Sequence, residues 1–185
     1  MKTKKLTLGA VMLALAILLP QVFHLTGISR SGEIFLPMHI PILLAGFFLG
    51  PWYGLVIGMS APIISFFLTA MPALPRLPSM VVEVGIYGMV CGYLYCSFML
   101  YRKKQGILIS LLVAMVVGRL AFALTLFIAS NILGLKGLAP IAAWEAVIIG
   151  IPGIIIQILL VPAVVYALKR GGITDDFFEK SQKRF

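Results

Sequence analysis

Long apolar segments, interrupted by short stretches of charge, glycine or proline, limit what this chain can fold into. A helix needs about 20 residues to cross the hydrocarbon core of a bilayer, and the second segment, at about 14 residues, is clearly shorter. That segment is either a helix with little tilt or one broken at Pro41. We predict six transmembrane helices at Leu6–Ile28, Leu36–Leu49, Trp52–Ala70, Ser79–Tyr101, Gly106–Ile132 and Ile141–Leu168.

The residue composition supports placing these helices in lipid. Of the 185 residues, 61% are hydrophobic and only 11% are charged, whereas soluble domains carry about 25% charged residues. We therefore expect an all-α integral membrane protein. The first segment is not followed by a small-residue cleavage site, which predicts a retained helix rather than a signal peptide. We treat residues 1–185 as a single transmembrane domain, with a cytoplasmic tail of about residues 169–185.

The basic residues predict how the helices are oriented. The net charge is +9, but the basic residues mostly flank apolar segments, which favours topology signals over nucleic-acid binding. With the N-terminus in the cytoplasm, only Arg30, Arg76 and Lys136 fall outside. The residues that fall inside are Lys2, Lys4, Lys5, Arg102, Lys103, Lys104, Lys169, Arg170, Lys180, Lys183 and Arg184. Since both ends are basic, six spans place both termini in the cytoplasm.

Ionisable side chains are distributed unevenly across the predicted membrane. They fall in the outer halves of the spans, whereas the cytoplasmic halves carry none before the flanking basic clusters. A charged side chain in hydrocarbon costs on the order of 3 kcal/mol, so such residues face a partner or a wet cavity. This asymmetry predicts a ligand pocket toward the extracellular side. The candidate substrate-binding residues, chosen by depth and polarity, are Glu83, Tyr87, Arg119, His39, Glu145, Trp144, Arg76 and Asn131.

Several of these residues also have a purely structural interpretation. Arg119 and one glutamate are equally compatible with an ion pair that only fixes the bundle. Glu145 fits an interfacial anchor, and Arg76, in a predicted loop, fits a solvated side chain. Glu83 is the strongest candidate, since Tyr87 lies one turn later on the same helix face.

The sequence contains no motif for catalysis, metal binding or nucleotide binding. Cys91 and Cys96 are five residues apart, so on a helix they point to different faces and cannot bridge to each other. The two Cys and two His lack the spacing of metal sites, and there is no GxxxxGK phosphate loop or serine elbow. We therefore expect no metal, no cofactor and no enzymatic activity.

Four stretches resemble the substrate-binding S-components of energy-coupling factor (ECF) transporters, the vitamin-uptake importers of prokaryotes. The first is AVMLA, Ala10 to Ala14, which is similar to the AxxxA motif of that family. The second, HIPILLAGFFLGPWYGLVIGMSAPIISFFLTAMP, is similar to helices two and three of the group that includes folate, pantothenate and riboflavin binders. The others are VVEVGIYGMVCGYLY and GIPGIIIQILLVPAVV, similar to the fourth helix and the end of the sixth.

This resemblance implies both a fold and a role. In that family, six helices enclose one small molecule near the outer face, under a lid formed by the loop between the first two helices. Ala10 and Ala14 match the surface that docks on a transmembrane coupling subunit of the EcfT type, which two cytoplasmic ATPases drive. The implied location is the plasma membrane of a prokaryote, where the S-component topples to carry its ligand inward.

The implied ligand is a water-soluble vitamin or a related micronutrient, and its chemistry stays open. The arginines would suit a carboxylate, as in pantothenate, folate or nicotinate. The glutamates would suit a ring nitrogen or hydroxyl, as in pyridoxine or a hydroxymethylpyrimidine. Two alternatives come from other classes. One is a small intramembrane enzyme that uses Glu83 or Glu145 as a base, and the other is a stand-alone proton-coupled carrier, which would need ionisable groups reachable from both sides.

Overall fold

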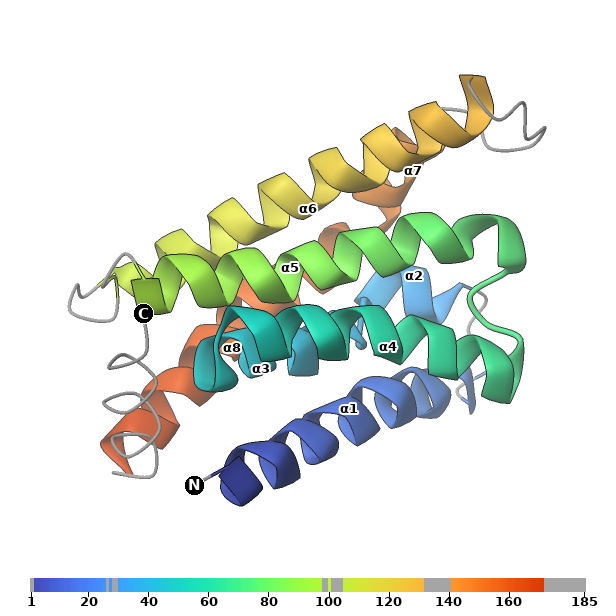
Figure 1. Cartoon of the computed structure of the whole chain (residues 1–185). Coiled ribbons are helices and arrows are strands. Elements are labelled where there is room, and N and C mark those ends of the chain that lie inside the picture. The colour runs from blue at the N-terminus through green and yellow to red at the C-terminus, as the bar shows by residue number, and fades with distance from the viewer. Residues whose placement is uncertain are drawn as a thin grey trace.

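The computed structural model describes residues 2–25, 27, 30–97, 100, 105–131 and 141–171, and within them the ordered elements are helices (Figure 1). These elements are α1 (Lys2–Leu25), α2 (Ser31–Phe35), α3 (His39–Leu49), α4 (Pro51–Thr69), η1 (Leu74–Arg76), α5 (Leu77–Ser97), α6 (Gly106–Asn131), α7 (Ile141–Ile149) and α8 (Ile151–Arg170).

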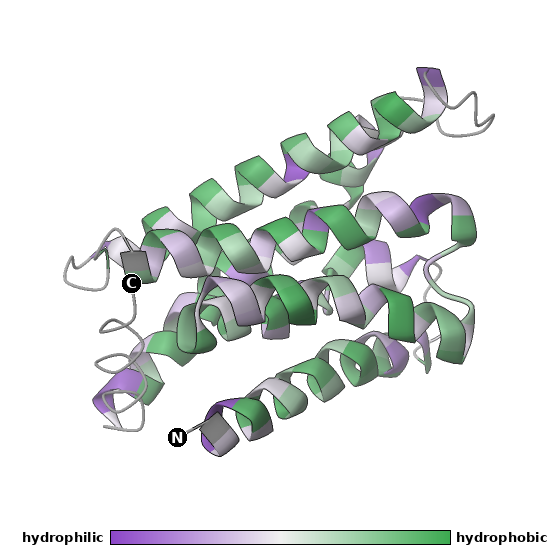
Figure 2. Cartoon of the chain, in the orientation of Figure 1, coloured by the Kyte–Doolittle hydropathy of each residue, from purple (hydrophilic) through white to green (hydrophobic). Residues whose placement is uncertain are grey.

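Six helical spans in the described chain are long and apolar enough to cross a membrane, which confirms the predicted class of a six-span, all-α protein. The spans are Thr3–Leu25, Ser31–Leu49, Pro51–Thr69, Leu74–Cys96, Gly106–Asn131 and Ile151–Arg170. The start of α1 and the end of α8 lie at the same end of the bundle (Figure 1). Apolar residues cover the outward faces of the long helices (Figure 2), as a lipid environment requires.

The predicted sixth helix, Ile141–Leu168, is wrong as a single element, because the chain forms two helices there. Helix α7 ends at Ile149, Gly150 separates the two, and α8 carries Pro152 in its first turn. Proline has no N–H to donate, and its ring clashes with the carbonyl group four residues earlier. The bend therefore follows from Pro152, and α8 alone is long enough to span.

The start of the second segment also differs from the prediction. Residues 31–35, which precede the predicted second segment, form the short helix α2, and Leu36 after it adopts a left-handed conformation with φ 49°. Pro41 lies in the first turn of α3, where a missing N–H is tolerated, so it does not break that helix. The predicted segment ends at Ile28, Tyr101 and Ile132 lie outside the described residues.

Helices α3, α4 and α5 approach one another with their backbones in contact. A Cβ atom added at Gly54 would overlap the carbonyl oxygen of Gly88, and one at Gly58 would lie 2.6 Å from the carbonyl oxygen of Val84. Gly92 is similarly enclosed. These small residues thus let the helix backbones pack closely within the bundle. Helix α3 is almost entirely buried behind this group.

Candidate functional site

A buried ion pair joins α5 to α6 inside the bundle. Nη1 of Arg119 lies 3.0 Å from Oε1 of Glu83, and the exposed fractions of the two side chains are only 14% and 3%. Both residues face inward because a charge directed at hydrocarbon would lack a partner. The predicted ion pair between Arg119 and one of the glutamates is therefore present, and Glu83 is that glutamate.

Two aromatic side chains extend this polar cluster into α3. Tyr87, one turn after Glu83, is hydrogen-bonded to the Glu83 carboxyl group. The ring of His39 meets the ring of Tyr87 edge-on, with 5.1 Å between the ring centroids. Gly118 on α6 leaves room for the Tyr87 ring, since a Cβ atom there would lie 3.1 Å from it. The absence of a side chain at Gly118 thus sets how closely α6 covers Tyr87.

Several polar atoms of this cluster have no hydrogen-bond partner among the described residues. They include Nε and Nη2 of Arg119, both buried. Neither ring nitrogen of buried His39 makes a hydrogen bond of standard geometry, although the ring lies near the Leu36 carbonyl group. Buried polar groups are nearly always paired in folded proteins. Unpaired donors at the centre of a bundle therefore point to a ligand or an ordered water that completes them.

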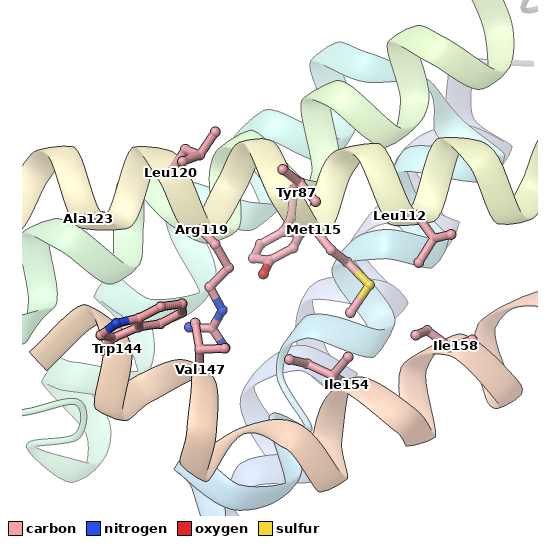
Figure 3. A pocket seen from close by; sticks show the side chains of 11 residues that line it. Tyr87, Leu112, Met115, Arg119, Leu120, Ala123, Trp144, Val147, Ile154 and Ile158 are labelled. Carbon is pink, nitrogen blue, oxygen red and sulfur yellow. The ribbon is translucent and has the colours of Figure 1, made fainter.

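A cavity of about 510 Å³ lies beside Arg119, between α6 and the α7–α8 pair. Figure 3 shows the Arg119 side chain reaching from α6 into this space, with Tyr87 behind it and Trp144 at one end. The volume is within the range of small-molecule sites. The residues that line it are Tyr87, Leu112, Met115, Val116, Arg119, Leu120, Ala123, Trp144, Val147, Ile154 and Ile158.

The structure brings five of the eight candidate residues together. Glu83, Tyr87 and Arg119 form the central cluster, His39 contacts Tyr87, and Trp144 lines the cavity. Trp144 itself is 67% exposed, which places it at the cavity's edge. These side chains come from four helices, so only the folded chain assembles them.

The remaining three candidates lie elsewhere. Arg76 is 2.6 Å from Glu33 through its Nη1 atom, and both side chains are 40% exposed. Glu145 is exposed on α7 and does not line the described cavity. Asn131, exposed at the end of α6, donates hydrogen bonds to the Phe127 carbonyl group and the Ser130 hydroxyl group.

Sequence reasoning missed the apolar walls of the cavity and the role of Glu33. The α6 wall includes Val116, Met115 and Leu112, which lie three, four and seven residues before Arg119. They share the Arg119 face of α6, but the other faces of that helix are apolar as well, so hydrophobicity alone does not mark them in the sequence. Glu33 also pairs with Arg30, three residues earlier. The spacing of Arg30 and Glu33 is visible in the sequence, whereas the contact between Glu33 and Arg76 is not.

Neither a metal centre nor a catalytic set emerges among the described residues. They contain no group of three or more His, Cys, Asp or Glu side chains that could hold a metal ion. The arrangement instead presents hydrogen-bond donors at the wall of an apolar cavity. That is binding chemistry.

Comparison with known protein families decides the identity of the chain. The family model for the ECF transporter, substrate-specific component, matches residues 4–165. The chain belongs to this family. The match confirms the resemblance to S-components and covers all six spans except the first residues of α1 and the last residues of α8. No curated protein and no solved structure gave a match.

As an ECF S-component, this protein is a multi-pass membrane subunit of a transporter and not an enzyme, which sets aside the alternative of an intramembrane enzyme. Membership also implies a small-molecule substrate and partnership with a transmembrane coupling subunit of the EcfT type and ATPase subunits. The buried cluster around Arg119 is therefore the candidate substrate-binding site of this S-component.

Proposed function

We propose that this S-component captures a water-soluble vitamin or related micronutrient outside a prokaryotic cell and delivers it inward with the ATP-driven energy-coupling module. The single observation that carries the proposal is the cavity beside the Glu83–Arg119 pair, in a chain of this family. Its volume suits one small molecule, and its polar lining residues are few: Tyr87, Arg119 and Trp144.

The proposed binding residues are Arg119, Glu83, Tyr87, His39 and Trp144. Arg119 lines the cavity and contacts the substrate directly through its guanidinium group. Glu83 and Tyr87 hold the guanidinium group in place, and His39 supports the Tyr87 ring from α3. Trp144, at the cavity edge, supplies a partly exposed aromatic surface for a ring to stack on.

We also propose the orientation predicted from the basic residues. Lys4 and Lys5 at the start of α1 and Lys169 and Arg170 at the end of α8 lie at the same end of the bundle (Figure 1), which we assign to the cytoplasm. Glu83 then lies near the outer end of α5, six residues after Leu77. A substrate would reach it from the extracellular side.

The experiment that tests this function is reconstituted uptake. The protein is co-expressed with the coupling subunit and the two ATPases encoded in the same genome, the complex is placed in proteoliposomes, and vitamins are screened for ATP-dependent accumulation. We expect accumulation of one compound only when all subunits are present. Accumulation without the ATPases would favour the stand-alone carrier, and no accumulation of any vitamin would overturn the vitamin-uptake role.

A matched pair of variants then locates the site. Arg119→Lys keeps the positive charge next to Glu83 but loses the planar guanidinium fork, so we expect it to weaken substrate binding strongly. Arg30→Lys makes the same change in an exposed ion pair outside the cavity, and we expect it to bind substrate like the wild type. Equal affinity in both variants would remove Arg119 from the site.

A further inference from the structure

Of the three polar side chains that line the cavity, those of Arg119 and Trp144 can only donate hydrogen bonds, whereas the Tyr87 hydroxyl group can also accept one. The guanidinium group of Arg119, which lines the cavity, can only donate, and its buried Nε and Nη2 atoms are unpaired among the described residues. The indole N–H of Trp144, also in the lining, is a donor only. The carboxylate next to Arg119, Glu83, is absent from the lining and is ion-paired with Arg119 at 3.0 Å, although its buried Oε1 atom accepts no hydrogen bond of standard geometry among the described residues. The cavity therefore suits a ligand that presents acceptor atoms.

The charge of the site is already balanced before a ligand enters. Arg119 is the one charged residue among the described residues that line the cavity, and Glu83 neutralises it at 3.0 Å. A ligand carboxylate would leave one negative charge without a counter-charge in the lining, and an ammonium group would leave one positive charge. An unbalanced charge is strongly disfavoured inside a membrane protein. A neutral acceptor, such as a carbonyl oxygen or ring nitrogen, avoids both.

The rest of the wall is apolar and supplied by two helices. Leu112, Met115 and Val116 come from α6, and Ile154 and Ile158 come from α8. A molecule rich in hydroxyl groups would lose its hydration there without new hydrogen bonds, which is unfavourable. An apolar or aromatic ring body would fit the same walls.

Building on the proposed function, we infer that the substrate is an uncharged, largely apolar ring compound whose carbonyl or ring-nitrogen acceptor binds the Arg119 guanidinium group at the cavity wall. This deepens the transport assignment by choosing among ligand chemistries that the sequence leaves open. It disfavours carboxylates as well as amines, although the site contains an arginine and a glutamate.

Matched probes test this inference with the full-length protein in detergent. Indole-3-acetamide, indole-3-acetate and tryptamine share one ring and differ in charge, and nicotinamide with nicotinate forms a second pair. Dissociation constants come from ligand-dependent thermal shifts, because a ligand that binds the folded state raises its stability by mass action. We expect each amide to bind roughly tenfold or more tightly than its carboxylate, with tryptamine the weakest.

A charge-neutralising variant sharpens the test. Glu83→Gln removes the counter-charge of Arg119, so we expect the preference to shift toward the carboxylate by about tenfold or more. Glu145→Gln removes the same charge from an exposed position on α7 and should leave the wild-type preference unchanged. The unliganded melting temperature and size-exclusion profile show whether each variant is folded. If Glu83→Gln does not fold, the ratio of amide to carboxylate dissociation constants in the wild type still tests the inference.

Tighter binding of the carboxylates or of tryptamine to the wild type would overturn the inference, and so would the absence of any shift at millimolar probe concentrations. Neither result would affect the transport assignment, which depends on ATP-dependent uptake. Conversely, failure of uptake with a clear amide preference would reject the transport role and leave the ligand chemistry of the cavity standing.

Discussion

Nη1 of Arg119 on α6 lies 3.0 Å from Oε1 of Glu83 on α5, in a contact that is almost completely enclosed. The two other guanidinium nitrogens, Nε and Nη2, are buried without a partner among the described residues. The same side chain thus holds two helices together and offers donors to the cavity. Stability and substrate binding therefore depend on one pair and can be separated by choosing the substitution.

Removing one member of this pair should be costly. We expect Arg119→Gln to lower the free energy of unfolding by about 3 kcal/mol, because it leaves Glu83 buried without its counter-charge. The double variant Glu83→Gln/Arg119→Gln should recover most of that loss. Thermal unfolding in detergent measures both. A double variant that is no more stable than Arg119→Gln alone would show that the two residues are not coupled.

An exposed pair provides the control for that experiment. Arg30 pairs with Glu33, and the exposed fractions of the two side chains are 46% and 40%. We expect Arg30→Gln to lower the free energy of unfolding by less than about 1 kcal/mol, since water and salt screen exposed pairs. A loss as large as that of Arg119→Gln would mean that burial does not explain the difference.

The inward position of Glu83 and Arg119 could be predicted from the sequence, because an unpartnered charge in lipid is so unfavourable that the residue itself marks the interior. The apolar cavity wall could not. Helices in lipid are apolar on their outer faces as well, so residues such as Met115 and Ile154 do not stand out by hydrophobic periodicity.

The position of Arg76 shows a second limit. Its partner, Glu33, is 43 residues away in the sequence, and only the placement of α2 beside η1 brings the two together. The bend at Gly150 shows a third limit of prediction from the sequence. The sequence GIPG carried the signal of a helix break, but the surrounding residues are uniformly apolar, and a continuous apolar segment was the simpler interpretation.

The Arg76–Glu33 pair leads to a prediction about substrate affinity. Because Arg76 does not line the cavity and its contact is partly exposed, we expect Arg76→Gln to change the substrate dissociation constant by less than about twofold. Its effect on unfolding free energy should be below about 1 kcal/mol and should shrink in high salt. Loss of binding comparable to that of Arg119→Lys would return Arg76 to the site.

The glycine contact between α4 and α5 should tolerate no side chain. Gly54→Ala places a Cβ atom on the Gly88 carbonyl oxygen, so the helices must separate. We expect the free energy of unfolding to fall by about 1 to 3 kcal/mol. Gly9→Ala is the matched control on α1, because its nearest contacts are side-chain atoms at 3.6 Å or more. It should be neutral or slightly stabilising, since alanine favours helix. Equal losses in the two variants would argue against backbone contact as the cause.

The last prediction concerns the proposed docking surface on α1. Ala10 and Ala14 are exposed on the described chain, on the same face of α1 and one turn apart. Small side chains allow close approach of another helix in lipid. We therefore expect Ala14→Trp to prevent co-purification with the coupling subunit while leaving the substrate dissociation constant of the isolated protein unchanged. Ala163→Trp makes the same substitution at an exposed position on α8 and should still co-purify. Normal co-purification of Ala14→Trp would remove this face of α1 from the interface, and loss of complex in both variants would show that the added bulk acts through the fold or the membrane rather than through one docking surface.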